Sequence, residues 1–298
     1  MEYILLNALS LGLIWSVMTM GVYISYRVLD VADLSVEGSI TLGAAVCASL
    51  MGRGLNPYLS LLFCLVAGAL AGLVTGLLHT KLRIPALLSG ILTMIALYSV
   101  NLKIMGVANL PLLRIPTAFS LVGGLLGLNK SLATILLSSV LALGLAFLLY
   151  WFFGTQIGSA IRATGNNPHM VRAQGVNTDT TLILGLMLAN ALVALSGGLI
   201  AQDQGFADVQ MGIGAIVIGL ASLIIGEVIM GQRRFLARLI SLIVGAIIYR
   251  LIIALVLRMG MHADDLQLFT AITVALALSL PRLKTIWEKN GASARGGK

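Results

Sequence analysis

The sequence predicts an all-α polytopic membrane protein with about nine transmembrane segments, within a range of eight to ten. Three observations lead to this prediction. Charged residues make up 10% of the 298 residues, whereas a soluble domain carries about 25%. Hydrophobic residues reach 59% and the mean hydropathy is +1.02, which is more apolar surface than a soluble globule can bury. Apolar runs of membrane-spanning length recur along the whole chain.

Seven of these runs have the length and composition of a transmembrane helix, which needs about 20 apolar residues. They cover residues 3–26, 57–78, 84–101, 131–153, 181–201, 239–257 and 266–281. Two further runs, 35–50 and 212–230, are apolar but rich in glycine, and they contain Glu37 and Glu227. These two either cross the membrane or form short, broken or re-entrant half-helices. We expect residues 1–298 to form a single transmembrane domain.

The distribution of basic residues predicts which side of the membrane each loop faces. With nine crossings, 13 of the 19 Lys and Arg residues fall on the side of the C-terminal tail, residues 282–298. Because basic residues are retained in cytoplasmic loops, we predict a multi-pass membrane protein with a cytoplasmic C-terminus and an external N-terminus. An even number of crossings would move the N-terminus inside. The basic loop residues on the predicted cytoplasmic side are Arg27, Lys81, Arg83, Arg162, Arg172, Arg233, Arg234 and Arg238.

Three glycines in the run 57–78 are spaced by four residues, at Gly68, Gly72 and Gly76. This spacing places them on one face of a helix. Small residues let helix backbones approach closely in lipid, where little hydrophobic force acts between helices. We therefore interpret these glycines as a helix-packing stripe and prefer this interpretation to a ligand site.

Two short segments resemble each other. Residues 32–36 read Ala-Asp-Leu-Ser-Val and residues 207–211 read Ala-Asp-Val-Gln-Met, and each precedes a glycine-rich apolar run. In the predicted topology they lie on opposite sides of the membrane, as the inverted repeats of transporters do. We expect inverted repeats, with chance similarity over five residues as the alternative.

Ionisable side chains inside lipid are costly, so those present need a partner, a cavity or a function. The apolar segments and their immediate flanks contain Asp30, Asp33, Glu37, Glu227 and Arg250. A substrate path lined by half-helices would explain the acids, and the structural alternative is that they cap half-helices or lie at the headgroup level. The candidate path or half-helix residues are Asp33, Glu37, Asn190, Asp208 and Glu227.

The polar interval 154–180 predicts a loop that contains one short helix. Asn167 followed by Pro168 is typical of a helix N-cap and first helical residue, and Gly175 is typical of the position after a helix C-terminus. The bracketed helix has about two turns. Because a helix of this length is unstable alone in water, we expect it to pack against its own bundle or against another subunit.

The matching positions of a family resemblance lie in this interval, at Gly158, Arg162, Ala163, Gly165, Asn167, Pro168, Arg172, Gly175, Val176 and Asn177. They resemble the cytoplasmic coupling loop of bacterial ATP-binding-cassette (ABC) importer permeases of the branched-chain amino acid and simple-sugar class. Residues 32–43, ADLSVEGSITLG, are similar to the first-half motif of that family, in which a short acidic or amide-bearing turn enters a glycine-rich helix.

The resemblance covers nearly the whole chain in length and segment order. It is nearest to a subgroup that is paired with lipoprotein binding proteins and is often assigned to aromatic or other amino acids. The common branched-chain members carry an Asn-Phe-Ala-His-Gly type of turn where this chain has residues 32–38. Their substrate is therefore not carried over to this chain.

The resemblance implies a permease subunit of an ABC importer in the bacterial inner membrane, which forms the path for a small polar, amino-acid-like solute. It implies partners in a pair of separate ATPase subunits that bind ATP and Mg, a second permease copy, and an extracytoplasmic substrate-binding lipoprotein. The second copy is either identical or a different chain, and a homodimer is compatible with both motif halves in one chain. The residues implied in coupling to the ATPase are Arg162, Asn166, Asn167, Pro168, Met170, Arg172 and Gly175.

Several motifs are absent from the sequence. It contains no G-x-x-x-x-G-K-[ST] phosphate loop, so this chain is not expected to bind ATP in the usual manner. His79, His169 and His262 lack metal-ligand spacing, so no metal site or other cofactor is expected. The net charge of +8 is assigned to cytoplasmic loops and not to nucleic-acid binding.

Two other function classes remain open. A proton-coupled secondary transporter could use the carboxylates of Asp33, Glu37 or Glu227 and would need no ATPase. A membrane-embedded enzyme would need a catalytic constellation, and the sequence shows none.

Overall fold

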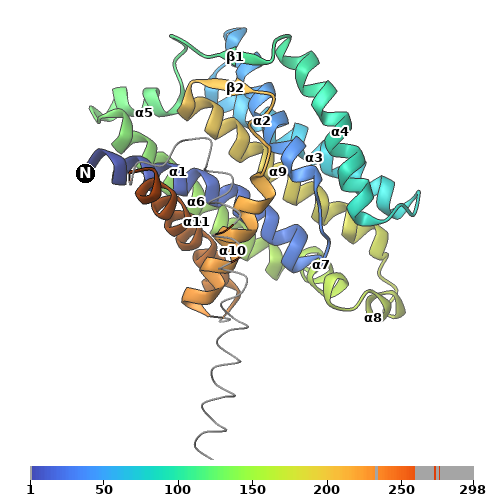
Figure 1. The fold of residues 1–298 in the computed structure, drawn as a ribbon. Coiled ribbons are helices and arrows are strands. Elements are labelled where there is room, and N and C mark those ends of the chain that lie inside the picture. The colour runs from blue at the N-terminus through green and yellow to red at the C-terminus, as the bar shows by residue number, and fades with distance from the viewer. Residues whose placement is uncertain (1, 232–233, 259–271, 273–274, 276–298) are drawn as a thin grey trace, which may run out of the picture.

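The computed structural model describes residues 2–231, 234–258, 272 and 275, and the statements below refer to these residues. They form a bundle of helices with one short pair of strands (Figure 1). The predicted segment 266–281, apart from two residues, and the predicted tail 282–298 lie outside the described residues. The predicted all-α membrane fold is confirmed.

Seven described helical spans are long and apolar enough to cross a membrane. The first combines α1 (Glu2–Tyr23) with a π-helical turn, η1 (Ile24–Val28). Because the described part of the chain holds seven such spans, it does not establish the predicted total of nine. The other six spans are α2 (Ser35–Gly52), α3 (Pro57–Thr80), α4 (Ala86–Met105), α6 (Lys130–Gly154), α9 (Thr178–Gln204) and α11 (Phe235–Arg258).

The remaining elements are short. The strands β1 (Asn109–Pro111) and β2 (Phe206–Asp208) pair antiparallel at one end of the bundle, which we call the β end. The helices α7 (Gln156–Asn166) and α8 (Pro168–Ala173) lie at the opposite end, which we call the α8 end (Figure 1). The sequence analysis predicted α8 but missed the strands, α7 and the helix α5 (Ala118–Leu126).

The glycine-rich run 212–230 contains a helix of 16 residues, α10 (Ala215–Met230), which is shorter than a full span. It begins beside the first turns of α2, where a Cβ on Gly212 would lie 2.5 Å from Oγ1 of Thr41. That point is well inside the bundle, because Ser39 of α2 bonds to Asn190 near the middle of α9. From there α2 runs to the β end and α10 runs to the α8 end. Both helices therefore start at mid-depth and point in opposite directions.

The chain repeats one arrangement in inverted orientation. A long helix, a turn, a helix that starts at mid-depth and a further long helix follow one another as α1, residues 29–34, α2 and α3. The same order recurs as α9, residues 205–214, α10 and α11. The two long first helices pack against each other, since Ser196 of α9 donates to the backbone oxygen of Ile14 at 3.0 Å. The predicted inverted repeats thus have a structural counterpart.

The turns before α2 and α10 have the same local hydrogen bond. In the first, Oδ1 of Asp33 accepts from the N–H of Ser35 at 2.9 Å. In the second, Oδ1 of Asp208 accepts from the N–H of Gln210 at 2.8 Å. Because an aspartate that bonds to the backbone two residues later forms a self-contained turn, the short sequence echo encodes the same turn twice.

The glycine stripe lies along the contact between α3 and α9. A Cβ on Gly68 would meet the backbone oxygen of Asn190, and one on Gly72 would meet the backbone oxygen of Leu186. A Cβ on Gly76 would lie 3.0 Å from Cα of Ile183. The two helices run antiparallel with their backbones in close approach, as small residues permit.

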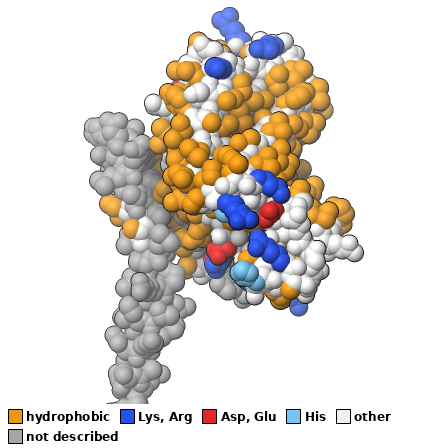
Figure 2. Space-filling view, turned by 90° about the vertical axis from the view of Figure 1, so that its right-hand side faces the viewer, with side chains coloured by type: hydrophobic (Ala, Val, Ile, Leu, Met, Phe, Trp, Pro, Cys, Tyr) orange, Lys and Arg blue, Asp and Glu red, His pale blue; other side chains and the backbone are white. Residues whose placement is uncertain are grey.

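The outer surface separates apolar from charged regions. Figure 2 shows a broad apolar face between basic side chains at one end and a cluster of basic, acidic and histidine side chains near the other. Arg27, Lys81 and Arg162 all lie at the α8 end, because they contact Glu227, Asp179 and Phe235 respectively. The three residues thus lie at the same end of the bundle, as expected for residues predicted to be on one side of the membrane.

Candidate functional site

The short helix α8 is the most exposed ordered element of the α8 end. Oδ1 of Asn167 accepts from the N–H of Met170 at 3.1 Å, and Pro168 occupies the first turn. Gly175 has a φ of +83°, the left-handed conformation that follows a helix C-terminus. Val171 is buried, so one side of α8 is anchored. The predicted helix and both of its end signals are confirmed.

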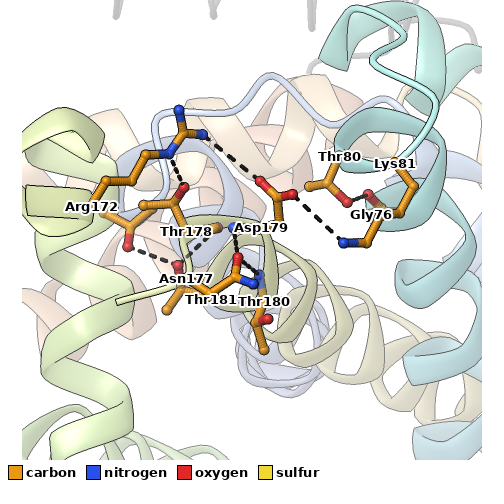
Figure 3. A network of polar contacts seen from close by, with 10 residues as sticks. Gly76, Thr80, Lys81, Arg172, Asn177, Thr178, Asp179, Thr180 and Thr181 are labelled. Atoms are coloured by element: carbon orange, nitrogen blue, oxygen red, sulfur yellow. Dashed lines mark hydrogen bonds and ion pairs between the residues drawn. The ribbon is translucent and has the colours of Figure 1, made fainter. Parts of the chain in front are cut away.

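A polar network connects α8 with α9 and with the α3–α4 turn (Figure 3). Nε of Arg172 donates to Oγ1 of Thr178 at 2.6 Å, and its Nη2 lies 3.8 Å from Oδ1 of Asp179. Nζ of Lys81 lies 3.7 Å from Oδ2 of the same aspartate. Exposed ion pairs of this length contribute little to stability. The network therefore mainly fixes the position of α8 relative to the bundle.

A polar cleft of about 860 Å³ lies between the α3–α4 turn and the start of α9. Basic side chains outnumber acidic ones in its lining. The lining residues are His79, Thr80, Lys81, Arg83, Ile84, Pro85, Arg172, Asn177, Thr178, Asp179 and Leu182.

The predicted coupling residues divide into two groups in the structure. Exposed positions in and around α8 are Asn166, Asn167, Pro168, Met170, Arg172 and Gly175. Arg162 is also exposed but lies on α7, with its guanidinium 4.7 Å from the ring centroid of Phe235 in α11. Arg162 is therefore part of the contact between α7 and α11.

The N-cap of α8 gives a direct test of its local stability. We expect Asn167→Ala to destabilise α8 by about 1 kcal/mol, because the N–H of Met170 loses its side-chain acceptor. Amide hydrogen exchange of residues 169–173 measures the effect as faster exchange. The neighbouring exposed Asn166→Ala serves as the control, and equal exchange in both variants would contradict the assigned cap.

Asp33 and Asn190 form a buried polar cluster near the middle of the bundle. Oδ2 of Asp33 accepts from Nδ2 of Asn190 at 2.8 Å, and its Oδ1 accepts from the backbone N–H and the hydroxyl of Ser35. Oδ1 of Asn190 accepts from the hydroxyl of Ser39 at 2.6 Å. Asp33 is 2% exposed. All the carboxylate bonds are internal, so this cluster fixes the turn before α2 against α9.

Glu37 lies in the first turn of α2 and is half-buried. Its Oε1 accepts from the N–H of Gly214, the N-cap residue of α10, at 3.0 Å. It lines a cavity of about 320 Å³ between α2, α4 and the turn before α10. The other lining residues are Gly38, Thr41, Met94, Ile95, Tyr98, Ser99, Asn101, Val209 and Ile213.

The two remaining acidic candidates lie at the ends of the bundle. Glu227 forms a two-point contact with Arg27, with Nε to Oε1 at 3.1 Å and Nη2 to Oε2 at 3.3 Å, at the α8 end. Asp208 lies at the β end, where its Oδ2 accepts from Nδ2 of Asn109 at 3.1 Å. The structure thus brings Asp33 and Asn190 together, puts Glu37 in a cavity nearby, and separates both other acids from them.

Several residues of these sites were missed in the sequence. Thr178 and Asp179 come shortly after the short helix that was predicted in the polar interval. The sequence Asn-Thr-Asp at residues 177–179 is typical of a helix N-terminus and could have identified the start of α9. Ser35, Ser39 and Asn101 occur singly in apolar runs. No local pattern marks them, because their partners are distant in sequence.

The chain is similar to known proteins over most of its length. A family described as "Branched-chain amino acid transport system / permease component" matches residues 4–278. A "Tyrosine transport system permease protein" of Clostridioides difficile (strain R20291) is 39% identical over 288 residues, which cover 97% of this chain and 95% of that protein.

Two further relatives are similar. An uncharacterized protein of Rickettsia prowazekii (strain Madrid E) is 33% identical over 285 residues, 93% of this chain and 97% of its own length. An "Autoinducer 2 import system permease protein" of Yersinia pseudotuberculosis (serotype O:1b, strain IP 31758) is 35% identical over 175 residues, 55% of this chain and 45% of its own. No solved structure matches the chain significantly.

Proposed function

The chain belongs to the family of permease components of branched-chain amino acid transport systems, and from this premise we propose how it works as the membrane subunit of an ABC importer. In this proposal the bundle forms the path for a small polar, amino-acid-like solute. The loop 154–180, with α8 at its tip, transmits movement from a separate ATPase. The chain itself carries out no catalysis, and ATP with Mg binds to the ATPase partner.

The exposed, doubly capped helix α8 is the observation that carries the coupling role. Its buried Val171 and the contacts of Arg172 hold it firmly to the start of α9. Asn166 to Met170 remain exposed, and the side chain of Met170 is 49% exposed. A rigid short helix that presents an apolar side chain suits docking into a groove of another protein, because a helix that is already ordered loses little conformational entropy on binding. We propose Met170 as the contact and Arg172 as a positioning residue.

The substrate proposal rests on the relative described as a tyrosine transport system permease, which covers nearly the whole chain. We propose an amino-acid-like solute for this chain. Among the candidate path residues, Glu37 lines a cavity and is assigned to the path. Asp33 and Asn190 are assigned to holding the turn before α2, and Asp208 and Glu227 to the two ends.

The proposed assembly has two copies of this chain, a pair of ATPase subunits at the α8 end, and a lipoprotein binding protein at the β end. The basic residues at the α8 end, which include Arg27, Lys81, Arg83 and Arg172, support a cytoplasmic position for that end. In the same topology the C-terminus is cytoplasmic.

The coupling role is tested by placing a charge on the exposed face of α8. We expect Met170→Asp to lower ligand-stimulated ATP hydrolysis of the complex reconstituted with its ATPase and binding protein by at least tenfold, since an apolar contact is replaced by a buried charge. The assay measures phosphate release with and without ligand.

The matched control is Met170→Leu, which keeps an exposed apolar side chain of similar size at the same position of α8. It should leave the ATP hydrolysis rate within about twofold of the parent. Full ligand-stimulated ATP hydrolysis by the Met170→Asp variant would contradict the proposed coupling role of α8. Uptake driven by a pH gradient in vesicles that contain this chain alone would favour the proton-coupled alternative.

A further inference from the structure

The cavity between α2, α4 and the turn before α10 is lined by two residues with a hydrogen-bond acceptor that the described part of the protein leaves unused. Oε1 of Glu37 accepts the N–H of Gly214. Among the described residues, no ion pair or further hydrogen bond involves the other carboxylate oxygen. An isolated carboxylate at membrane depth requires a partner or a function.

Asn101 supplies the second acceptor. It is 1% exposed, and its Nδ2 donates to the backbone oxygen of Gly38 at 3.2 Å. This bond identifies the nitrogen, so Oδ1 is the atom left over. Within the described part of the chain, Oδ1 has no hydrogen-bond partner. Leaving a buried acceptor unpaired costs about 1–3 kcal/mol, which a bound donor would recover.

The residues that carry these two acceptors belong to the lining of one cavity. Glu37 and Asn101 both line it, and Asn101 is bonded to the residue that follows Glu37. Thr41 lies one helical turn beyond Glu37 on the same face of α2, but its hydroxyl donates to the backbone oxygen of Glu37. Among the described residues, the cavity lining therefore carries one negative charge, one amide oxygen without a hydrogen-bond partner and no basic side chain.

We infer that this cavity binds the primary ammonium group of the transported solute through the carboxylate of Glu37 and Oδ1 of Asn101. An ammonium has three N–H donors and no acceptor, which is the complement of the two unused acceptors. This inference rests on the proposed transport function and names the part of the solute that the permease itself recognises.

The rest of the cavity suits an apolar or aromatic portion of the solute. Met94, Ile95 and Tyr98 of α4 and Ile213 of the turn before α10 provide its apolar walls. Its volume of about 320 Å³ lies at the lower end of the range for small-molecule sites. Ammonium recognition at one side and apolar contact at the other together describe an amine with an apolar substituent.

The test uses a reporter cysteine at Ser99, an exposed residue that lines the cavity. The native Cys47 and Cys64 are buried, so the parent protein gives the labelling blank. In the purified complex, Ser99→Cys is labelled with uncharged N-ethylmaleimide in the presence of tyramine, 4-ethylphenol or 3-(4-hydroxyphenyl)propionate. We expect tyramine to protect at a concentration at least tenfold lower than 4-ethylphenol, and the acid not to protect.

Two variants locate the recognition. Glu37→Gln keeps an acceptor for the N–H of Gly214 but loses the charge, and it should abolish the advantage of tyramine over 4-ethylphenol. Asn101→Leu keeps the side-chain size but loses Oδ1, and it should reduce the advantage about threefold or more. Glu227→Gln removes a carboxylate charge outside the cavity, next to Arg27, and should retain the advantage.

Equal protection by tyramine and 4-ethylphenol in the parent protein would overturn the inference. So would an unchanged tyramine advantage in a Glu37→Gln protein that elutes like the parent. Neither result involves ATP hydrolysis, and the coupling role of α8 would stand or fall separately on the Met170 experiment.

Discussion

Gly72→Leu, a substitution in α3, is expected to prevent stable folding of the protein. A Cβ at this position would meet the backbone oxygen of Leu186 and would lie 2.7 Å from Cα of Met187. Both are backbone atoms of α9 and cannot rotate away. The helices would have to separate along their whole contact, so we expect a cost of at least about 3 kcal/mol. The yield of monodisperse protein in detergent and its thermal unfolding midpoint measure this.

Gly144→Leu is the matched control for that experiment. Gly144 lies within α6, and a Cβ there would meet nothing within 4 Å. Leucine is a better helix former than glycine by about 0.8–1 kcal/mol, so this variant should be as stable as the parent or more so. Similar unfolding midpoints for the two variants would show that the close contact of α3 with α9 does not hold the bundle together.

The glycine stripe illustrates what the sequence reveals and what it does not. A spacing of four within an apolar run predicts that one helix face is packed closely. The partner, α9, begins about 100 residues later in the chain, and nothing in the stripe itself specifies it. Similarly, the local Asn-Pro and Gly signals predicted α8 correctly, because helix caps depend on neighbouring residues alone.

Depth within the membrane was the main feature that the sequence could not provide. The run 35–50 is apolar enough to be a full crossing, yet α2 starts at the middle of α9 because Ser35 and Ser39 bond to Asn190. Hydropathy measures composition and not depth. Segment boundaries predicted from hydropathy are also wrong where a polar side chain has a partner inside the bundle. The predicted segment 84–101 stops at Asn101, but α4 continues to Met105, because Asn101 donates a hydrogen bond to the backbone oxygen of Gly38.

Asp33→Ala is the second change for which we expect a large effect, about 3 kcal/mol or more of lost stability. The carboxylate accepts hydrogen bonds from the N–H of Ser35, the hydroxyl of Ser35 and Nδ2 of Asn190. Its removal leaves the N–H of Ser35 and one of the two Nδ2 hydrogens of Asn190 without an acceptor, at about 1–3 kcal/mol each, whereas the Ser35 hydroxyl keeps Oδ1 of Asn190 as an acceptor. Lipid and packed helices surround the site, so water cannot replace the lost bonds. The thermal unfolding midpoint of the purified protein measures the loss.

The inverted repeat provides a control with the same local chemistry. Asp208 makes the equivalent bond to the N–H of Gln210, but at the β end, where Asn109 and Gln210 are exposed. Water can solvate the donors freed by Asp208→Ala, so we expect a loss below about 1 kcal/mol. A similar loss for both variants would mean that the turn alone sets the cost. A much larger loss for Asp33→Ala would show that burial has made one copy of the turn the anchor of α2, and with it of the cavity that Glu37 lines.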